Sequence, residues 1–211
     1  MKEIPAHVSA VLFDMDNTLT DSEIAWDKAA QSLWAEAGKK LEREIPLGGT
    51  VEDVVTVYRS DFPTADPQTT AQRMLELLRA NLTEVIPTPG ADALVRRLTV
   101  PRAISSNSPG QIVREVTTAV GWTDLFTTML GADEVDSPKP APDLYLEAAR
   151  RCGAALENCV VFEDSAMGAQ AARAAGAGYL VTIGPDAREL GDKNVASLQD
   201  PAITQWNPQL K

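Results

Sequence analysis

Short apolar runs alternate along most of the chain with segments whose apolar residues recur at helical spacing. Nearly continuous apolar runs of this kind are typical of strands buried on both faces of a parallel sheet. We expect strands at 8–13, 103–105, 160–162 and 179–183, and a weaker one at 127–130. Helical patterns lie between these runs.

We expect helices at 111–120, 142–152 and 166–175, because a glycine follows each pattern and Pro142 opens the second. Strands that alternate with helices predict an α/β fold with a Rossmann-like parallel sheet. Helices should cover both faces of that sheet.

The stretch from about residue 22 to residue 85 interrupts the alternation, since it has three helical patterns and no good strand. Residues that can cap a helix precede the patterns: Ser22 or Asp21, then Thr50, then Asp66 or Thr69. We therefore expect an inserted all-helical cap domain at 21–86. The Rossmann-like catalytic core would comprise 1–20 and 87–211.

Acidic residues outnumber basic ones, since the 211 residues carry 30 Asp and Glu against 19 Lys and Arg. The net charge of −11 repels phosphate backbones and anionic lipids, so we expect no nucleic-acid partner and no membrane partner. The sequence gives no sign of an obligatory protein partner. It also lacks an apolar stretch of about 20 residues and a signal peptide, so the expected localisation is cytoplasmic.

Histidine and cysteine chemistry is nearly excluded by composition. Cys152 and Cys159 are the only cysteines, and they fit neither a disulfide framework nor the spacing of a zinc site. His7 is the only histidine, and it precedes the first strand, which is a poor place for a Ser-His-Asp base. Carboxylates, hydroxyls and lysine remain as the candidate chemistry.

Polar side chains follow three of the predicted strands and precede one predicted helix. They are Asp14 and Asp16, Ser106 and Asn107, Lys139, and Glu163 and Asp164. Sites in open parallel sheets form at the carboxyl ends of the strands, so we expect these side chains to lie together.

Several carboxylates at one place cannot all remain ionised without a cation. The candidate ligands are Asp14, Asp16, Glu163 and Asp164, and oxygen donors of this kind suit Mg²⁺. The sequence therefore predicts a magnesium site at this edge of the sheet.

The same residues can carry out phosphoryl transfer. Asp14 can attack phosphorus and form an aspartyl-phosphate. Asp16 can protonate the leaving alkoxide and later deprotonate the attacking water. Lys139, Ser106 and the Asn107 amide can bind the phosphoryl group of a small phosphorylated substrate.

These segments resemble the four motifs of the haloacid dehalogenase-like hydrolase superfamily. The motifs are Asp14-x-Asp16-x-Thr18, Ser106-Asn107, Lys139-Pro140 and Glu163-Asp164-Ser165. The helical insertion resembles the α-helical cap of the phosphoglycolate phosphatase and β-phosphoglucomutase branch. The resemblance covers about residues 8–184, and four ordered motifs are far more specific than one D-x-D.

The resemblance implies a role for each motif residue. Asp14 would be the nucleophile and a metal ligand, and Asp16 the acid/base, with its backbone carbonyl on the metal. Asp164 would be the acidic metal ligand, with Glu163 as its support or as a second ligand. Ser106 and Lys139 would bind phosphate.

Asn17 stands where the family usually has Gly. Asn is the best non-glycine residue for a left-handed backbone, so we expect the turn to survive.

The favoured function is a Mg²⁺-dependent phosphatase, a phosphoric monoester hydrolase acting on a sugar phosphate or similar metabolite. Asp16 disfavours dehalogenation, because the dehalogenase members lack this second aspartate. A β-phosphoglucomutase-like sugar phosphomutase is the alternative, although that branch has a histidine where this chain has Trp26. A phosphate-accepting signalling module or a ligand-binding module is the non-enzyme alternative.

Substrate specificity is expected to lie in the cap. The candidate residues are Ser22, Trp26, Gly48 and Gly49. Trp26 and Trp34 fall on the apolar side of the first cap helix, which favours packing within the cap over contact with substrate.

Overall fold

A six-stranded parallel sheet forms the centre of the computed structural model, which describes residues 3–82 and 85–211. The strand order is β4-β3-β2-β5-β6-β7. The strands are β2 (Ala10–Phe13), β3 (Arg102–Ser105), β4 (Thr128–Leu130), β5 (Cys159–Glu163), β6 (Tyr179–Ile183) and β7 (Lys193–Val195).

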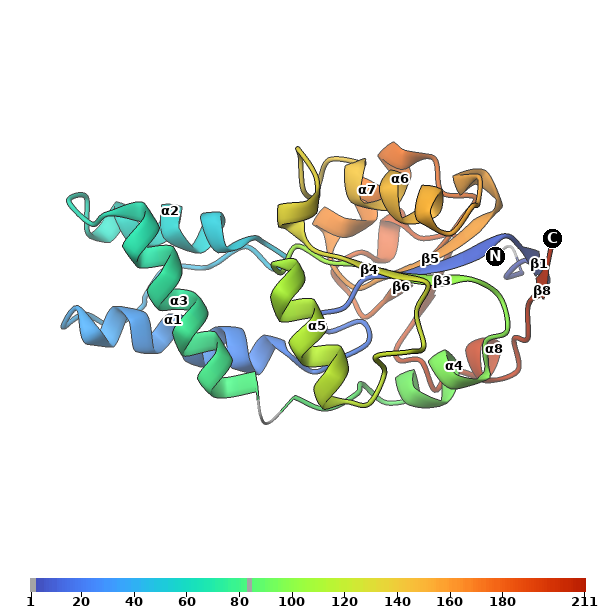
Figure 1. Cartoon of the computed structure of the whole chain (residues 1–211), viewed down its shortest axis with the longest axis horizontal. Coiled ribbons are helices and arrows are strands. Elements are labelled where there is room, and N and C mark those ends of the chain that lie inside the picture. Colours follow the sequence, from blue (N-terminus) through green and yellow to red (C-terminus); the bar gives the residue numbers. More distant parts are fainter. Residues whose placement is uncertain (1–2, 83–84) are drawn as a thin grey trace.

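Helices cover both faces of the sheet, as the alternating pattern predicted (Figure 1). The helices α6 (Asp143–Arg151) and α7 (Ala166–Ala175) lie on one face. The other face carries α4 (Ala91–Arg97), α5 (Gly110–Ala119) and α8 (Pro201–Thr204). The Rossmann-like α/β architecture is thus confirmed.

Alternate residues of β2 enter two separate apolar cores, because successive side chains of a strand point to opposite faces. Val11 and Phe13 join the core that contains Ile112 of α5. Ala10 and Leu12 join the core that contains Tyr145 of α6. The central strand therefore has no face in contact with water, which explains its unbroken apolar run.

Several elements differ from the expectation for the core. The run at 8–13 is divided at Ser9, so that β1 (His7–Val8) leaves the main sheet and pairs in parallel with β8 (Gln209–Leu210). Helices α4 and α8 and strands β7 and β8 were not predicted, since all four are short and Lys193–Val195 is a partly polar edge strand. None of the four has enough residues for a clear periodic pattern.

Three helices form the insertion, which extends to one side of the sheet (Figure 1). They are α1 (Glu23–Glu36), α2 (Val51–Asp61) and α3 (Pro67–Asn81), and α3 packs against both others. The expected caps are confirmed for α2 and α3, where the Thr50 and Asp66 side chains accept backbone N–H groups.

Trp34 is fully buried among the three helices and confirms the packing role expected for it. Its indole nitrogen donates to Asp61 Oδ2 at 2.9 Å, which joins α1 to the end of α2. None of the helices in the described parts of the chain has the length and apolar content that crossing a membrane requires.

Candidate active site

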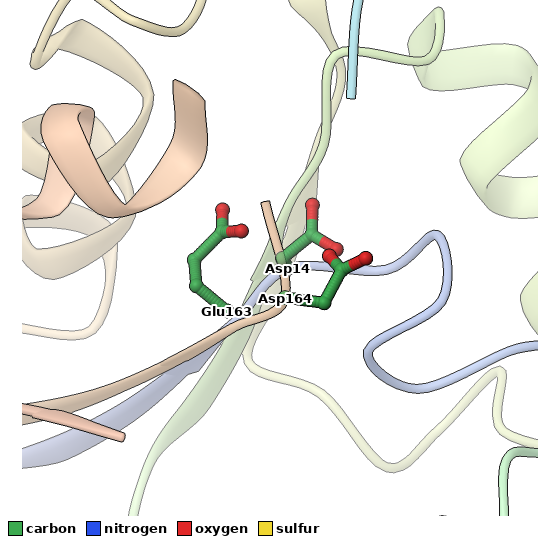
Figure 2. Close-up of side chains that lie close together, drawn as sticks. All are labelled: Asp14, Glu163 and Asp164. Atoms are coloured by element: carbon green, nitrogen blue, oxygen red, sulfur yellow. The ribbon is translucent and has the colours of Figure 1, made fainter. Parts of the chain in front are cut away.

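Three carboxylates meet where β2 and β5 end. Phe13 and Phe162 are paired in register, so the residues that follow them, Asp14 and Glu163, emerge at the same edge. Oxygen atoms of Asp14, Glu163 and Asp164 all lie within 4.8 Å of one another. Figure 2 shows Asp14 between the other two, with its carboxylate beside that of Asp164.

Lys139 is the cation of this cluster and is 4 % exposed. Its Nζ donates to Asp14 Oδ1 at 2.7 Å and to Glu163 Oε1 at 2.5 Å. Burial alone would lower the pKa of Lys139, but Asp14 and Glu163 outweigh burial and hold it above its ordinary value. The lysine therefore stays charged.

Tyr145 completes the buried network and was not predicted as a site residue. Its hydroxyl donates to Glu163 Oε1 at 2.6 Å, and burial raises its pKa well above the ordinary value, as does Glu163. Glu163 also accepts from the hydroxyl of Ser165, at 3.2 Å. Tyr145 and Ser165 thus hold the Glu163 carboxylate, which in turn fixes the position of the Lys139 ammonium group.

The cluster remains short of positive charge. Burial raises the pKa of Asp14 well above its ordinary value, and Glu163 raises it further, against the opposing effect of Lys139. Burial and Glu163 likewise raise the pKa of Asp164 to about 7. Asp14 Oδ2 is buried with no hydrogen-bond partner among the described residues. Oxygen donors with raised pKa values and an orphaned oxygen fit a divalent cation.

The Asp16 carboxylate, a candidate metal ligand, lies outside the cluster formed by Asp14, Glu163 and Asp164. Ser106 and Ser108 donate to its Oδ2 at 2.9 Å each, and Ser22 donates to its Oδ1. Three hydroxyls from two separate segments therefore orient this carboxylate. The resemblance assigned the backbone carbonyl of Asp16, not its side chain, to the metal.

Ser106 and Ser22 both have contacts other than those first considered. The Ser106 hydroxyl, a candidate phosphate donor, is directed to Asp16, and phosphate binding by Ser106 stays a prediction. Ser22 precedes α1 but its side chain makes no capping bond. Ser22 is fully buried and holds Asp16 instead.

The turn after Asp14 has the conformation that the sequence led us to expect. Asn17 has a φ of 59°, in the left-handed region that Asn tolerates best among non-glycine residues. The Asn17 side chain donates to Glu23 at the start of α1. Thr18 Oγ1 donates to Asp164 Oδ1 at 3.2 Å, which joins the first motif to the fourth.

Asn107 connects the core to the insertion. Its Nδ2 donates to the carbonyl of Gly48 at 2.8 Å and to that of Lys139 at 3.0 Å. Its Oδ1 accepts the Lys139 backbone N–H at 2.9 Å. The side-chain amide of Asn107 is thus fully engaged, which leaves its backbone amide as the candidate phosphate donor.

Gly48 touches the core so closely that a side chain would not fit. Its φ is 72°, and an added Cβ would lie 2.8 Å from Ser165 Oγ. The loop before α2 therefore lies against the N-terminus of α7, and the insertion covers the carboxylates.

A small cleft of about 80 Å³ lies between the loop and the strand ends. Asp14, Asp16, Asn107 and Asp164 line it from the core. Of the four candidate specificity residues, Trp26, Gly48 and Gly49 line it from the insertion, and the buried Ser22 does not. Trp26 also packs against the apolar core, so it combines both alternatives considered for it.

The matched family model is described as haloacid dehalogenase-like hydrolase and covers residues 8–176. Hexitol phosphatase B of Escherichia coli is 30% identical over 211 residues, which span 93% of this chain and 95% of the relative. A bifunctional riboflavin kinase/FMN phosphatase of Arabidopsis thaliana is also 30% identical. That match spans 94% of this chain and 55% of the relative's length.

A solved haloacid dehalogenase family hydrolase from Deinococcus radiodurans, with bound phosphate and sodium, has a similar structure. Its TM-score is 0.69 and its identity 30%, over 92% of this chain and 93% of that one. The chain belongs to the haloacid dehalogenase-like hydrolase family, as its ordered motifs indicated.

The raised pKa of Asp164 predicts how the stability of the metal-free protein changes with pH. The folded protein holds this proton up to about pH 7, whereas the unfolded chain loses it near the ordinary value of 3.8. Between these values the unfolded chain binds fewer protons, so the free energy of unfolding falls as pH rises. The contribution is at most about 1.4 kcal/mol per pH unit.

Urea unfolding in excess EDTA at several pH values measures this contribution as the difference between wild type and Asp164→Asn. The wild-type protein should lose stability relative to the variant as pH rises from about 4 to about 7. A difference that does not change across this range would contradict the assignment.

Proposed function

We propose that this protein is a Mg²⁺-dependent phosphatase that hydrolyses a small phosphorylated metabolite, such as a sugar phosphate, through an aspartyl-phosphate intermediate. The observation that carries the proposal is the buried Asp14–Lys139–Glu163 network, in which Asp14 also lines the cleft. Two relatives named as phosphatases and a similar structure with bound phosphate support it.

Mg²⁺ would be held by Asp14, Asp164 and the backbone carbonyl of Asp16, with Glu163 as support through Lys139. The orphaned Asp14 Oδ2 and the raised pKa of Asp164 favour this set. When bound, the ion supplies charge neutralisation for the phosphoryl group. The Asp16 side chain is then left for proton transfer.

In the first step Asp14 attacks phosphorus, and the bond from phosphorus to the leaving oxygen breaks. Asp16 gives its proton to that oxygen, so the product leaves as an alcohol. In the second step Asp16 takes a proton from water, which attacks the phosphorus while the bond from phosphorus to the Asp14 oxygen breaks, so that inorganic phosphate leaves and the Asp14 carboxylate is restored. The serines around Asp16 orient it for both transfers.

Lys139 would offset negative charge on the phosphoryl group, because Glu163 and Tyr145 hold its ammonium beside Asp14. Ser106 and the Asn107 backbone amide would complete phosphate binding. The helices α1–α3, within the boundaries 21–86, would act as the cap that excludes bulk water.

Hydrolysis is favoured over phosphomutase activity by the residues that line the cap side of the cleft. Trp26, Leu47, Gly48 and Gly49 line this side, and none of the described residues of the cleft lining is a Lys, Arg or His that would hold the second phosphate of a sugar bisphosphate. Water should therefore accept the phosphoryl group from Asp14.

Asp14→Asn should abolish phosphate release while the protein stays folded, because an amide is a poor nucleophile. Phosphate release from a panel of phosphorylated sugars measures this loss, and circular dichroism checks the fold. The exposed Asp124→Asn, which makes the same chemical change far from the cluster, is the control. Wild-type turnover in folded Asp14→Asn protein would contradict the nucleophile assignment.

Activity should disappear in excess EDTA and return with Mg²⁺. Ca²⁺ should inhibit, because its longer and less regular coordination misaligns the attack. Phosphate release after metal replacement measures the effect. Full activity in EDTA would exclude the proposed metal role.

Phosphatase and mutase are distinguished by the product formed from β-glucose 1-phosphate, with Mg²⁺ and a trace of the bisphosphate primer. We expect inorganic phosphate and glucose as products. Glucose 6-phosphate appearing much faster than inorganic phosphate would favour the mutase instead.

A further inference from the structure

The cap side of the cleft is acidic. Glu23 and Asp27 lie one turn apart near the start of α1, and both line the cleft. None of the described residues that line this cleft is Lys, Arg or His. A substrate whose phosphoryl group reaches Asp14 therefore places the rest of its structure beside two carboxylates.

The positive charge at the catalytic end of the cleft is already paired with carboxylates of the protein. Lys139 and a bound Mg²⁺ would together carry three positive charges, which would offset those of Asp14, Glu163 and Asp164. The charges of Glu23 and Asp27 are additional to this balanced set. A second anionic group on the substrate would face them at short range in a partly desolvated cleft.

The basic side chain that lines the adjoining hollow is paired with a carboxylate of the insertion. Arg43 lines the adjoining hollow beside Asp27, but its Nε pairs with Asp61 Oδ1 at 3.0 Å. Lys39 pairs with the same oxygen of Asp61 at 2.8 Å. Both cations join the loop between α1 and α2 to the last residue of α2.

Glu23 and Asp27 can nevertheless bind an uncharged substrate, because carboxylates accept hydrogen bonds from hydroxyl groups. The Asn17 side chain holds Glu23 Oε2 in place. Trp26, Leu47 and Val54 line the same cleft and offer apolar contact to carbon atoms between the hydroxyls. The orphaned, buried Asp14 Oδ2 marks the end of this cleft at which the ligand reacts.

We propose that the cleft selects phosphomonoesters of polyols that carry no second negative charge, with Glu23 and Asp27 accepting hydrogen bonds from the polyol hydroxyls. This inference rests on the proposed phosphatase function and specifies its substrate class. Substrates with a carboxylate or a second phosphate on the leaving group are disfavoured by repulsion.

Matched esters that differ in one terminal group test the proposal. Sorbitol 6-phosphate, 6-phosphogluconate and 1-amino-1-deoxysorbitol 6-phosphate share a six-carbon chain that ends in a hydroxymethyl, a carboxylate or an ammonium group. Glycerol 1-phosphate and 3-phosphoglycerate give the same contrast on three carbons. We expect kcat/KM to be at least roughly tenfold higher for the uncharged ester than for its carboxylate partner.

The ammonium ester should be hydrolysed at least as well as sorbitol 6-phosphate. Raising the ionic strength should bring the kcat/KM values of uncharged and anionic esters closer together, because salt screens the repulsion.

The double variant Glu23→Gln, Asp27→Asn keeps the shape of the cleft and removes both charges. In this variant, the ratio of kcat/KM for the uncharged ester to kcat/KM for the anionic ester should be roughly tenfold smaller than in the wild-type protein. The ratio is informative even if total activity falls, because both esters use the same catalytic residues. Glu52→Gln, an exposed cap residue outside the cleft lining, makes the same type of change and should leave the ratio unaltered.

Binding to Asp14→Asn protein, measured by calorimetry, gives a second readout that does not depend on turnover. Sorbitol 6-phosphate should bind more tightly than 6-phosphogluconate, and the variants should change this preference as they change kcat/KM.

Equal kcat/KM for uncharged and anionic esters, or an unchanged ratio in the double variant, would overturn the proposal. Hydrolysis of p-nitrophenyl phosphate without activity on either uncharged polyol ester would also overturn it. Absence of Mg²⁺-dependent phosphate release from every ester would instead contradict the proposed phosphatase function.

Discussion

The contact between Lys139 and two buried carboxylates is the constraint on which the active-site end of the fold depends. Lys139, Asp14 and Glu163 are all nearly or fully buried, so each charge would be costly without the others. Asp14 and Glu163 come from the ends of β2 and β5, and Lys139 comes from the loop before α6. The geometry of the site therefore depends on the register of these two strands. Tyr145 from α6 adds a hydrogen bond from the helix layer.

This arrangement also explains why the cluster is suited to binding a cation. Lys139 supplies one positive charge for three carboxylates, and the raised pKa values of Asp14 and Asp164 report the deficit. Water could relieve the deficit by solvating the carboxylates, but the insertion and the sheet keep the cluster buried. A protein that only stabilised its own fold would gain little from such a cluster.

The sequence predicted most of the core because periodicity and punctuation are local properties. The alternating pattern led to the strands and helices of the sheet, and the position of Asp14, Ser106 and Glu163 after strands identified the site edge. Tyr145 was missed because its signal is an ordinary apolar helix face, and its hydroxyl partner comes from another strand. The direction of the Ser106 hydroxyl was also beyond sequence reasoning, since it depends on where the Asp16 carboxylate lies.

The side chain of Asn107 divides its hydrogen bonds unequally between the two parts of the molecule. One bond reaches Gly48 in the loop before α2, and two reach the backbone of Lys139. If the loop moved away to admit a ligand, Asn107 would lose only its bond to Gly48. The segment that carries Lys139 would keep both of its bonds, so the charged floor of the cleft stays assembled while the entrance is open.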